Sequence, residues 1–245
     1  MTPNESTIES LAHSAKETLV TLATDLSTIP GFVDAFATYV AGIWATSDFA
    51  KMRGAQGLGE EKVGSEYAMA GCVKFAVAGG TNALLRGDFI NLLSQTPFLL
   101  GSFAEYLEHH PELLKDSRVK RAFIILGSLP GVLATSAATG GLGLAANMAS
   151  GEFEDHPATS LVKVLGFGVS QSGYALRESK NGLAKGLAHT FGNGIIAVVS
   201  FLEILYKIQA GLPVNHASIF WGVSSTANTW NSAKGLVKEG QRLIG

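Results

Sequence analysis

Charged side chains are scarce in this sequence. Lys, Arg, Asp and Glu make up 16 % of its 245 residues, whereas soluble globular domains average about 25 %. Hydrophobic residues make up 47 % of the chain, and the mean hydropathy is +0.25. A water-soluble body of this size covers its surface with solvated groups, and 18 basic plus 20 acidic residues are thin cover for it. The shortage of charge therefore favours a protein that lies in or against a membrane.

Other absences exclude whole classes of function. The net charge of −2 and the lack of aromatic residues interleaved with Lys or Arg argue against nucleic-acid binding. Cys72 is the single cysteine, so the chain has neither an internal disulfide nor a cysteine-based metal cluster. The first ten residues hold Glu5 and Glu9 but no basic residue, and no apolar stretch follows at once. We therefore expect no cleavable signal peptide, and any membrane insertion would use the helices of the mature chain.

What the sequence does contain is helical periodicity. Residues 5–28 are predicted to form one amphipathic helix, because apolar residues recur there at three- and four-residue steps. Pro30 and Gly31 are predicted to end that helix. Strictly alternating runs typical of β-strands are missing. Seven apolar segments separated by short charged clusters follow: 31–47, 67–85, 89–107, 122–149, 160–176, 187–206 and 208–230.

These patterns predict an all-α protein. We expect an N-terminal amphipathic helix (residues 1–28) and then one hydrophobic helical bundle (residues 29–245) with about six or seven membrane-spanning helices. The 29 glycines often stand beside Ala, Ser or Thr. In lipid, surfaces of small residues let helices approach closely enough for van der Waals contact to hold them together. Gly- and Ala-rich helix packing is therefore part of the prediction.

The longest uncharged run extends from Ala122 to Gly151, thirty residues without an ionisable side chain. As a helix it would be about 45 Å long, more than the ~30 Å of a hydrocarbon core. A second interpretation stays open, in which residues 122–149 form a helical hairpin that turns at Thr139-Gly140-Gly141 inside a soluble bundle. The other segments are weaker candidates, since Asp34, Lys74, Pro97 and Lys163 interrupt them. Such buried charges could pair with another helix.

Loop charge gives an independent indication of membrane topology, because cytoplasmic loops carry an excess of Lys and Arg. Basic residues lie in the loops at 108–121 and 177–185 and in the C-terminal tail: Lys115, Arg118, Lys120, Arg121, Arg177, Lys180, Lys185, Lys234, Lys238 and Arg242. The intervening loop at 151–159 holds only acidic charges, from Glu152, Glu154 and Asp155. If the four segments after residue 121 cross a membrane, the basic loops share one side. Lys207 is the one exception.

One cluster carries enough ionisable groups for chemistry. Glu105, Glu108, His109 and His110 are weak candidates for a divalent-metal site or a proton relay. Pro111 disfavours helical geometry at His110, so we expect the helix to end there. The alternative interpretation is a solvated helix end, where imidazolium is favourable. No His-Glu-x-x-His, Walker or Gly-x-Ser-x-Gly sequence is present. We therefore expect neither an enzyme nor a cofactor.

Three tryptophans lie near the ends of apolar segments. Trp44, Trp221 and Trp230 are candidates for membrane anchoring, because amphipathic rings favour the lipid headgroup zone. The alternative is that they are core aromatics.

Three functional hypotheses follow. The leading one is a non-enzymatic helical membrane protein that acts as a structural subunit or scaffold, or as a small channel or transporter. Its expected partners are the lipid membrane and either other membrane subunits or further copies of itself. The alternative is a soluble helical bundle that inserts the hairpin 122–149 into membranes, as pore-forming toxins do. The third is an intramembrane enzyme or ion carrier that uses the Glu105–Glu112 cluster.

Overall fold

The computed structural model describes residues 5–114, 116–150, 157–175, 182–214 and 216–244. Every regular element in these ranges is a helix, which confirms the all-α prediction there. The helices are α1 (Glu5–Leu26), α2 (Ile29–Gly57), α3 (Glu61–Arg86), α4 (Phe89–Ser94), α5 (Thr96–His109), α6 (Ser117–Leu126), α7 (Leu129–Ser150), α8 (Pro157–Ala175), α9 (Gly182–Ala210) and α10 (His216–Ile244).

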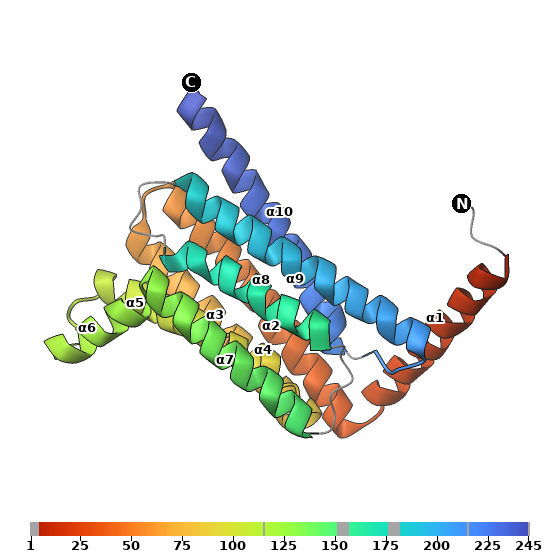
Figure 1. Cartoon of the computed structure of the whole chain (residues 1–245). Coiled ribbons are helices and arrows are strands. Elements are labelled where there is room, and N and C mark those ends of the chain that lie inside the picture. Colours follow the sequence, from red (N-terminus) through yellow and green to blue (C-terminus); the bar gives the residue numbers. More distant parts are fainter. Residues whose placement is uncertain (1–4, 115, 151–156, 176–181, 215, 245) are drawn as a thin grey trace.

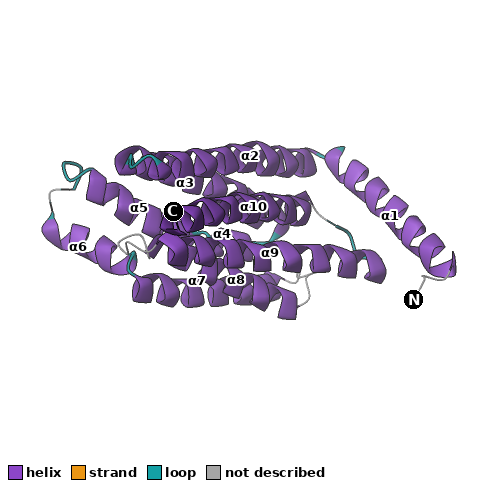
Figure 2. Ribbon diagram, turned by 90° about the horizontal axis from the view of Figure 1, so that it is seen from above, coloured by secondary structure: helices purple, strands orange, loops and turns teal. Residues whose placement is uncertain are grey.

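Helices α2, α3, α7, α8 and α9 run side by side (Figures 1 and 2), and the C-terminal end of α10 points away from them (Figure 1). Helices α2 and α3 pack together, as do α8 with α9 and α9 with α10, and α7 packs against α4 and α8. The turn between α2 and α3, the end of α5 and helix α6 lie at one end of the bundle, and α1 leaves it at the other (Figure 1). We call these the α6 end and the α1 end. Helix α1 meets the bundle through contacts with α2 and α9.

The same four-residue pattern starts two of the helices. Thr28-Ile29-Pro30-Gly31 begins α2, and Ser128-Leu129-Pro130-Gly131 begins α7. In each, the hydroxyl accepts a hydrogen bond from the glycine N–H, at 3.1 Å in α2 and 3.4 Å in α7. Proline is favourable in a first helical turn, where its missing N–H costs nothing. The predicted break after the first helix is confirmed, because α1 ends at Leu26. Pro30 itself does not end that helix, since it belongs to the start of α2.

Glycine is required in this pattern because the preceding helix lies close. A Cβ at Gly31 would lie 2.1 Å from the backbone oxygen of Asp25, and one at Gly131 would lie 2.3 Å from that of Ile125. Each pattern thus folds the chain sharply between two helices. The angle between α1 and α2 is 100°.

The predicted hairpin at Thr139-Gly140-Gly141 is wrong, because α7 runs without a break from Leu129 to Ser150. Thr139 donates its hydroxyl hydrogen to the Thr135 oxygen at 2.7 Å, inside the helix. A Cβ at Gly140 would lie 2.2 Å from Cγ1 of Val164, so this glycine serves the contact between α7 and α8. The uncharged run is broken earlier, between α6 and α7 at Gly127 and Ser128.

Small residues let the helices approach closely at several places. A Cβ at Gly192 of α9 would lie 2.2 Å from the backbone nitrogen of Ser170 on α8. A Cβ at Gly143 of α7 would lie 3.0 Å from Cα of Ile90 on α4. Contacts between backbones at such distances leave no room for a side chain. An aromatic core fills the space between α2, α3 and α10, and it includes Phe49, Phe75, Phe220 and Trp221.

Three of the described helices are long and apolar enough to cross a membrane: Glu61–Arg86, Leu129–Ala149 and Leu183–Ala210. The bent pair Ala12–Leu26 and Ile29–Gln56 adds a fourth candidate if it counts as one span. The described residues of all seven predicted apolar segments lie mainly on helices. Breaks fall at Gln95, at residues 127–128 and at residues 211–214. The number of six or seven spans stays a prediction, as does the division into domains at residue 28.

Candidate functional site

The interior of the bundle is rich in charge. Each of the following ionisable side chains is buried, with at most 5 % of the residue exposed: Asp34, Asp48, Glu105, Lys163, Glu203 and Lys207. Charged residues are almost never buried in this way unless they are paired. Four polar features of the interior, taken in turn below, are the candidate functional regions.

The most deeply buried cluster joins α8, α9 and α10. Lys163 Nζ of α8 donates to Glu203 Oε2 of α9 at 2.6 Å. Ser218 of α10 donates its hydroxyl hydrogen to Glu203 Oε1 at 2.9 Å, and Lys207 Nζ lies 3.8 Å from the same oxygen. Glu203 thus connects three side chains from three helices, and we call the four residues the Glu203 cluster. It explains why Lys207 breaks the pattern of loop charge: its side chain is buried and paired rather than part of a loop.

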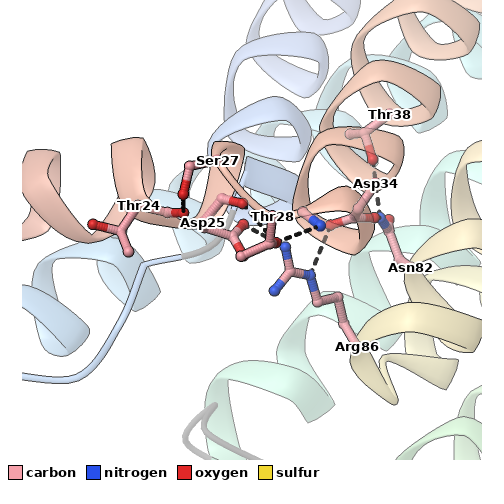
Figure 3. A network of polar contacts seen from close by, with 9 residues as sticks. Thr24, Asp25, Ser27, Thr28, Asp34, Thr38, Asn82 and Arg86 are labelled. Atoms are coloured by element: carbon pink, nitrogen blue, oxygen red, sulfur yellow. Dashed lines mark hydrogen bonds and ion pairs between the residues drawn. The ribbon is translucent and has the colours of Figure 1, made fainter.

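A second cluster lies where α1 turns into α2 (Figure 3). Arg86, at the end of α3, donates from Nε to Asp34 of α2 at 3.0 Å and also pairs with Asp25 of α1. Asn82 donates to Asp34 at 2.6 Å and to Thr38 at 2.9 Å. Arg86 therefore holds carboxylates from both sides of the bend between α1 and α2.

A third pair joins α2 to α3, where Lys74 binds the carboxylate of Asp48. Asp34, Lys74 and Lys163 are the charges that interrupt the predicted apolar segments. Each of the three has a partner of opposite charge on another helix. This confirms the expectation that such charges pair between helices.

The fourth feature is a cavity of about 30 Å³ in the middle of the bundle. Aromatic rings form one part of its wall: Phe49, Phe75, Phe98, Phe167 and Trp221. Polar side chains form the other part: Arg53, Gln95, Ser170, His189, Asn193, Ser224, Ser225 and Asn228. Because one water needs roughly 10–15 Å³ of such space, the cavity has room for about two or three waters or one small ion.

Several hydrogen bonds fix the polar wall of the cavity. Arg53 donates to Asn228 Oδ1 at 3.3 Å, which joins α2 to α10. Asn193 of α9 donates to the Ser170 hydroxyl at 3.1 Å and to the His189 backbone oxygen at 2.8 Å. Ser170 and Gln171 lie inside helix α8. Gln171 bonds to Ser136 of α7 and to the Ser94 backbone oxygen.

The predicted cluster at the end of α5 is divided between two neighbours. Helix α5 ends at His109, as the position of Pro111 predicts. Glu105 faces α2 and accepts a hydrogen bond from Gln56 at 3.2 Å. His110 is buried and lies 3.1 Å from a carboxylate oxygen of Glu66 on α3. Glu108 and His109 are half-buried.

This division matters for the metal hypothesis. Within the described ranges, no three His, Cys, Asp or Glu side chains gather closely enough to hold a metal ion. The candidates Glu105 and His110 instead have separate hydrogen-bond partners on α2 and α3.

The three tryptophans lie in two environments. Trp44 and Trp230 are exposed, whereas Trp221 is 2 % exposed and packs in the aromatic core, with ring centroids 5.2 Å from Phe75. Trp221 therefore has the core position of the alternative interpretation, and its buried ring cannot contact lipid headgroups.

Sequence reasoning missed Glu203, Arg86 and the cavity. Opposite charges inside apolar segments were an available signal for Lys163 with Glu203, since each is the one charged residue of its predicted segment, 160–176 and 187–206. The cavity had no such signal, because its walls come from six helices that are distant in sequence. Comparison with protein-family models, curated proteins and solved structures found no match for this chain.

Proposed function

We propose that this chain is an integral membrane protein with about seven spans and that it works as a small carrier or channel. The observation that supports this proposal best is the distribution of polarity: paired charges lie inside the bundle, and large apolar side chains lie on its outer surface. A soluble protein has the opposite arrangement. The spans of the proposal are α2, α3, α4 with α5, α7, α8, α9 and α10.

The outer surface supports the embedding in lipid. Its exposed large side chains form stripes at helical spacing, as on α9: Leu187, Phe191, Val198, Phe201, Leu202, Leu205 and Tyr206. The described side chains of α7, α8 and α9 include no exposed charged residue, and the same holds for residues 29–50, 67–86 and 216–233. Contiguous apolar surface of this extent marks a membrane or partner contact.

The ends of the helices support one orientation. Near the α6 end, basic side chains are frequent: Lys51, Arg53, Lys62, Arg118, Lys120, Arg121, Lys185, Lys234 and Lys238. At the α1 end, Arg86 is paired with two aspartates and Lys207 is buried. The acidic Glu152, Glu154 and Asp155 and the basic Arg177 and Lys180 lie outside the described residues. The rule that cytoplasmic loops are basic therefore puts the α6 end in the cytoplasm.

The buried charges favour transport over a purely structural role. A charge within a membrane is costly, and ionisable residues there most often line a pathway for an ion or solute. A scaffold that only packs against other subunits needs no Lys163–Glu203 pair in its interior. The structural-subunit hypothesis remains the second candidate, supported by the exposed apolar stripes, which could equally contact other membrane helices. The divided Glu105–His110 cluster gives no support to the third hypothesis, an intramembrane enzyme.

Flux through the purified protein tests the carrier proposal. The protein is reconstituted in liposomes, and efflux of potassium, chloride and protons is followed with ion-selective electrodes and a pH dye. We expect the native protein to pass at least one of these ions. In the Glu203→Gln variant we expect this flux to fall at least about tenfold. Glu61→Gln, an exposed carboxylate at the start of α3, is the matched control and keeps the flux. Liposomes with correctly inserted protein that pass none of these ions at a rate above that of empty liposomes would remove the carrier proposal.

A further inference from the structure

We infer that the central cavity is a binding site for a small monovalent anion, with a halide ion as its simplest occupant. The first observation is an excess of hydrogen-bond donors in its wall. The side-chain N–H groups of Gln95 and Trp221 are fully buried and have no hydrogen-bond acceptor in the protein. Both residues line the cavity. Indole nitrogen can only donate, so only an acceptor can satisfy Trp221.

Two acceptors of the wall are already used by the protein. The Asn228 oxygen accepts from Arg53, and the Ser170 hydroxyl accepts from Asn193. Because protein donors occupy these two oxygens, they are less available to a cation that enters the cavity. An anion would find the two N–H groups of Gln95 and Trp221 instead.

Charge in the wall has one sign. Arg53 lines the cavity, and no Asp or Glu is among the described residues that line it. The nearby buried carboxylate of Glu105 is not part of the wall, and it accepts a hydrogen bond from Gln56. Guanidinium stays protonated in proteins and offers five N–H donors, so Arg53 supplies positive charge to the cavity at every pH of interest.

The aromatic residues suit an anion as well. The edge of an aromatic ring carries positive partial charge, and its face carries negative charge. Phe75 and Trp221 meet at an interplanar angle of 53°, and Phe167 meets Trp221 edge to face at 81°. The volume of about 30 Å³ admits a monatomic ion and excludes a large organic anion.

This inference gives the proposed carrier its substrate class and rests on the proposed function in that respect. Binding itself is separable from transport, because it is measured on the purified full-length protein in detergent. Tryptophan emission supplies the readout, since bromide and iodide quench an indole that they contact. Trp44→Phe with Trp230→Phe removes the two exposed tryptophans and leaves Trp221 as the single emitter.

Titration of this variant with sodium bromide at constant ionic strength is the test. We expect bromide to quench the Trp221 emission to a saturating level, and we expect chloride to compete with bromide for the site. Gln95→Glu places a carboxylate in the wall and is expected to weaken bromide binding at least about tenfold. Gln209→Glu, the same change at an exposed position of α9, leaves the affinity unchanged. Where Gln95→Glu does not fold, Gln95→Met removes the donor without adding charge and is expected to weaken binding too.

Quenching that rises linearly with bromide, is unaffected by chloride and is the same in Gln95→Glu would overturn the inference and leave a cavity that holds water only. Saturable quenching by caesium but not by bromide would overturn it as well, because the site would then select cations. Neither result bears on whether the chain spans a membrane, which is measured separately.

Discussion

Lys163 Nζ of α8 lies 2.6 Å from Glu203 Oε2 of α9, and both side chains are almost completely enclosed by the bundle. Glu203 also accepts a hydrogen bond from Ser218 of α10. One carboxylate therefore connects three helices, and its removal leaves two lysine side chains in an interior that does not solvate them.

The first prediction compares the removal of Glu203 with the removal of Lys163. Removing one partner of a buried ion pair typically costs about 3–5 kcal/mol, because the other charge stays behind. Glu203→Leu is expected to lower the thermal stability more than Lys163→Met, since it leaves both Lys163 and Lys207 behind. The double variant is expected to be more stable than Glu203→Leu alone. Equal effects of the two single changes that simply add in the double variant would contradict the shared role of Glu203.

Unfolding can be followed with the protein's own cysteine. Cys72 is buried, with its sulfur 3.0 Å from the Ser102 hydroxyl, so a thiol-reactive fluorescent dye reaches it when the bundle opens. The melting temperature Tm in detergent is the quantity measured for all stability predictions here.

The second prediction concerns the contact of α8 with α9. Gly192→Ala would bring a methyl group to 2.2 Å from the Ser170 backbone nitrogen, so the helices must separate. The expected cost is about 2 kcal/mol, or roughly 4–8 °C in Tm. Gly141→Ala is the matched control, since no atom lies within 4 Å of a Cβ there. The control is expected to be neutral or slightly stabilising, because alanine favours helix. A Tm of Gly192→Ala equal to that of the control would disprove the close contact.

The third prediction concerns the bend between α1 and α2. Arg86→Gln removes the group that binds Asp25 on one side of the bend and Asp34 on the other (Figure 3). Helix α1 is expected to adopt a wider range of angles. Spin labels at the exposed Ala15 and Leu84, in a Cys72→Ala background, measure the distance distribution between α1 and α3. The distribution broadens in Arg86→Gln; an unchanged distribution would show that Arg86 does not hold the bend.

The fourth prediction concerns topology. Single cysteines at Leu58 and Leu113, near the α6 end, and at Pro213, between α9 and α10, are exposed positions in described turns. Each single-cysteine variant is expressed in cells in a Cys72→Ala background. A membrane-impermeant maleimide added outside is expected to label the Pro213→Cys variant in intact cells and the other two variants only after lysis. Labelling of all three from outside would contradict seven spans in the proposed orientation.

The helices themselves could be predicted from sequence because apolar periodicity is a local property. The described residues of all seven apolar segments lie mainly on helices, and the end of α5 at His109 follows from Pro111. Local rules failed where one residue serves two purposes. Pro30 was expected to stop a helix and in fact starts one. Gly140, which one of two open interpretations placed in a turn, makes room for Val164 inside α7.

The candidate sites were harder to predict, because they depend on which helices become neighbours. Lys163 and Glu203 are forty positions apart, and their pairing requires α8 and α9 to pack side by side. Trp221 was indistinguishable in sequence from Trp44, yet only Trp221 faces the aromatic core. Glu105 and His110 are close in sequence, but their side chains have hydrogen-bond partners on two different helices, α2 and α3.

Extraction of the expressed protein's membrane fraction with alkaline sodium carbonate tests the central claim most directly. Carbonate removes peripheral proteins and leaves integral ones in the membrane pellet. The outward apolar stripes and inward charges predict that the full chain stays in the pellet and leaves it only with detergent. Release into the supernatant as a monodisperse protein without detergent would contradict the account, since the exposed apolar surface would then be stable in water.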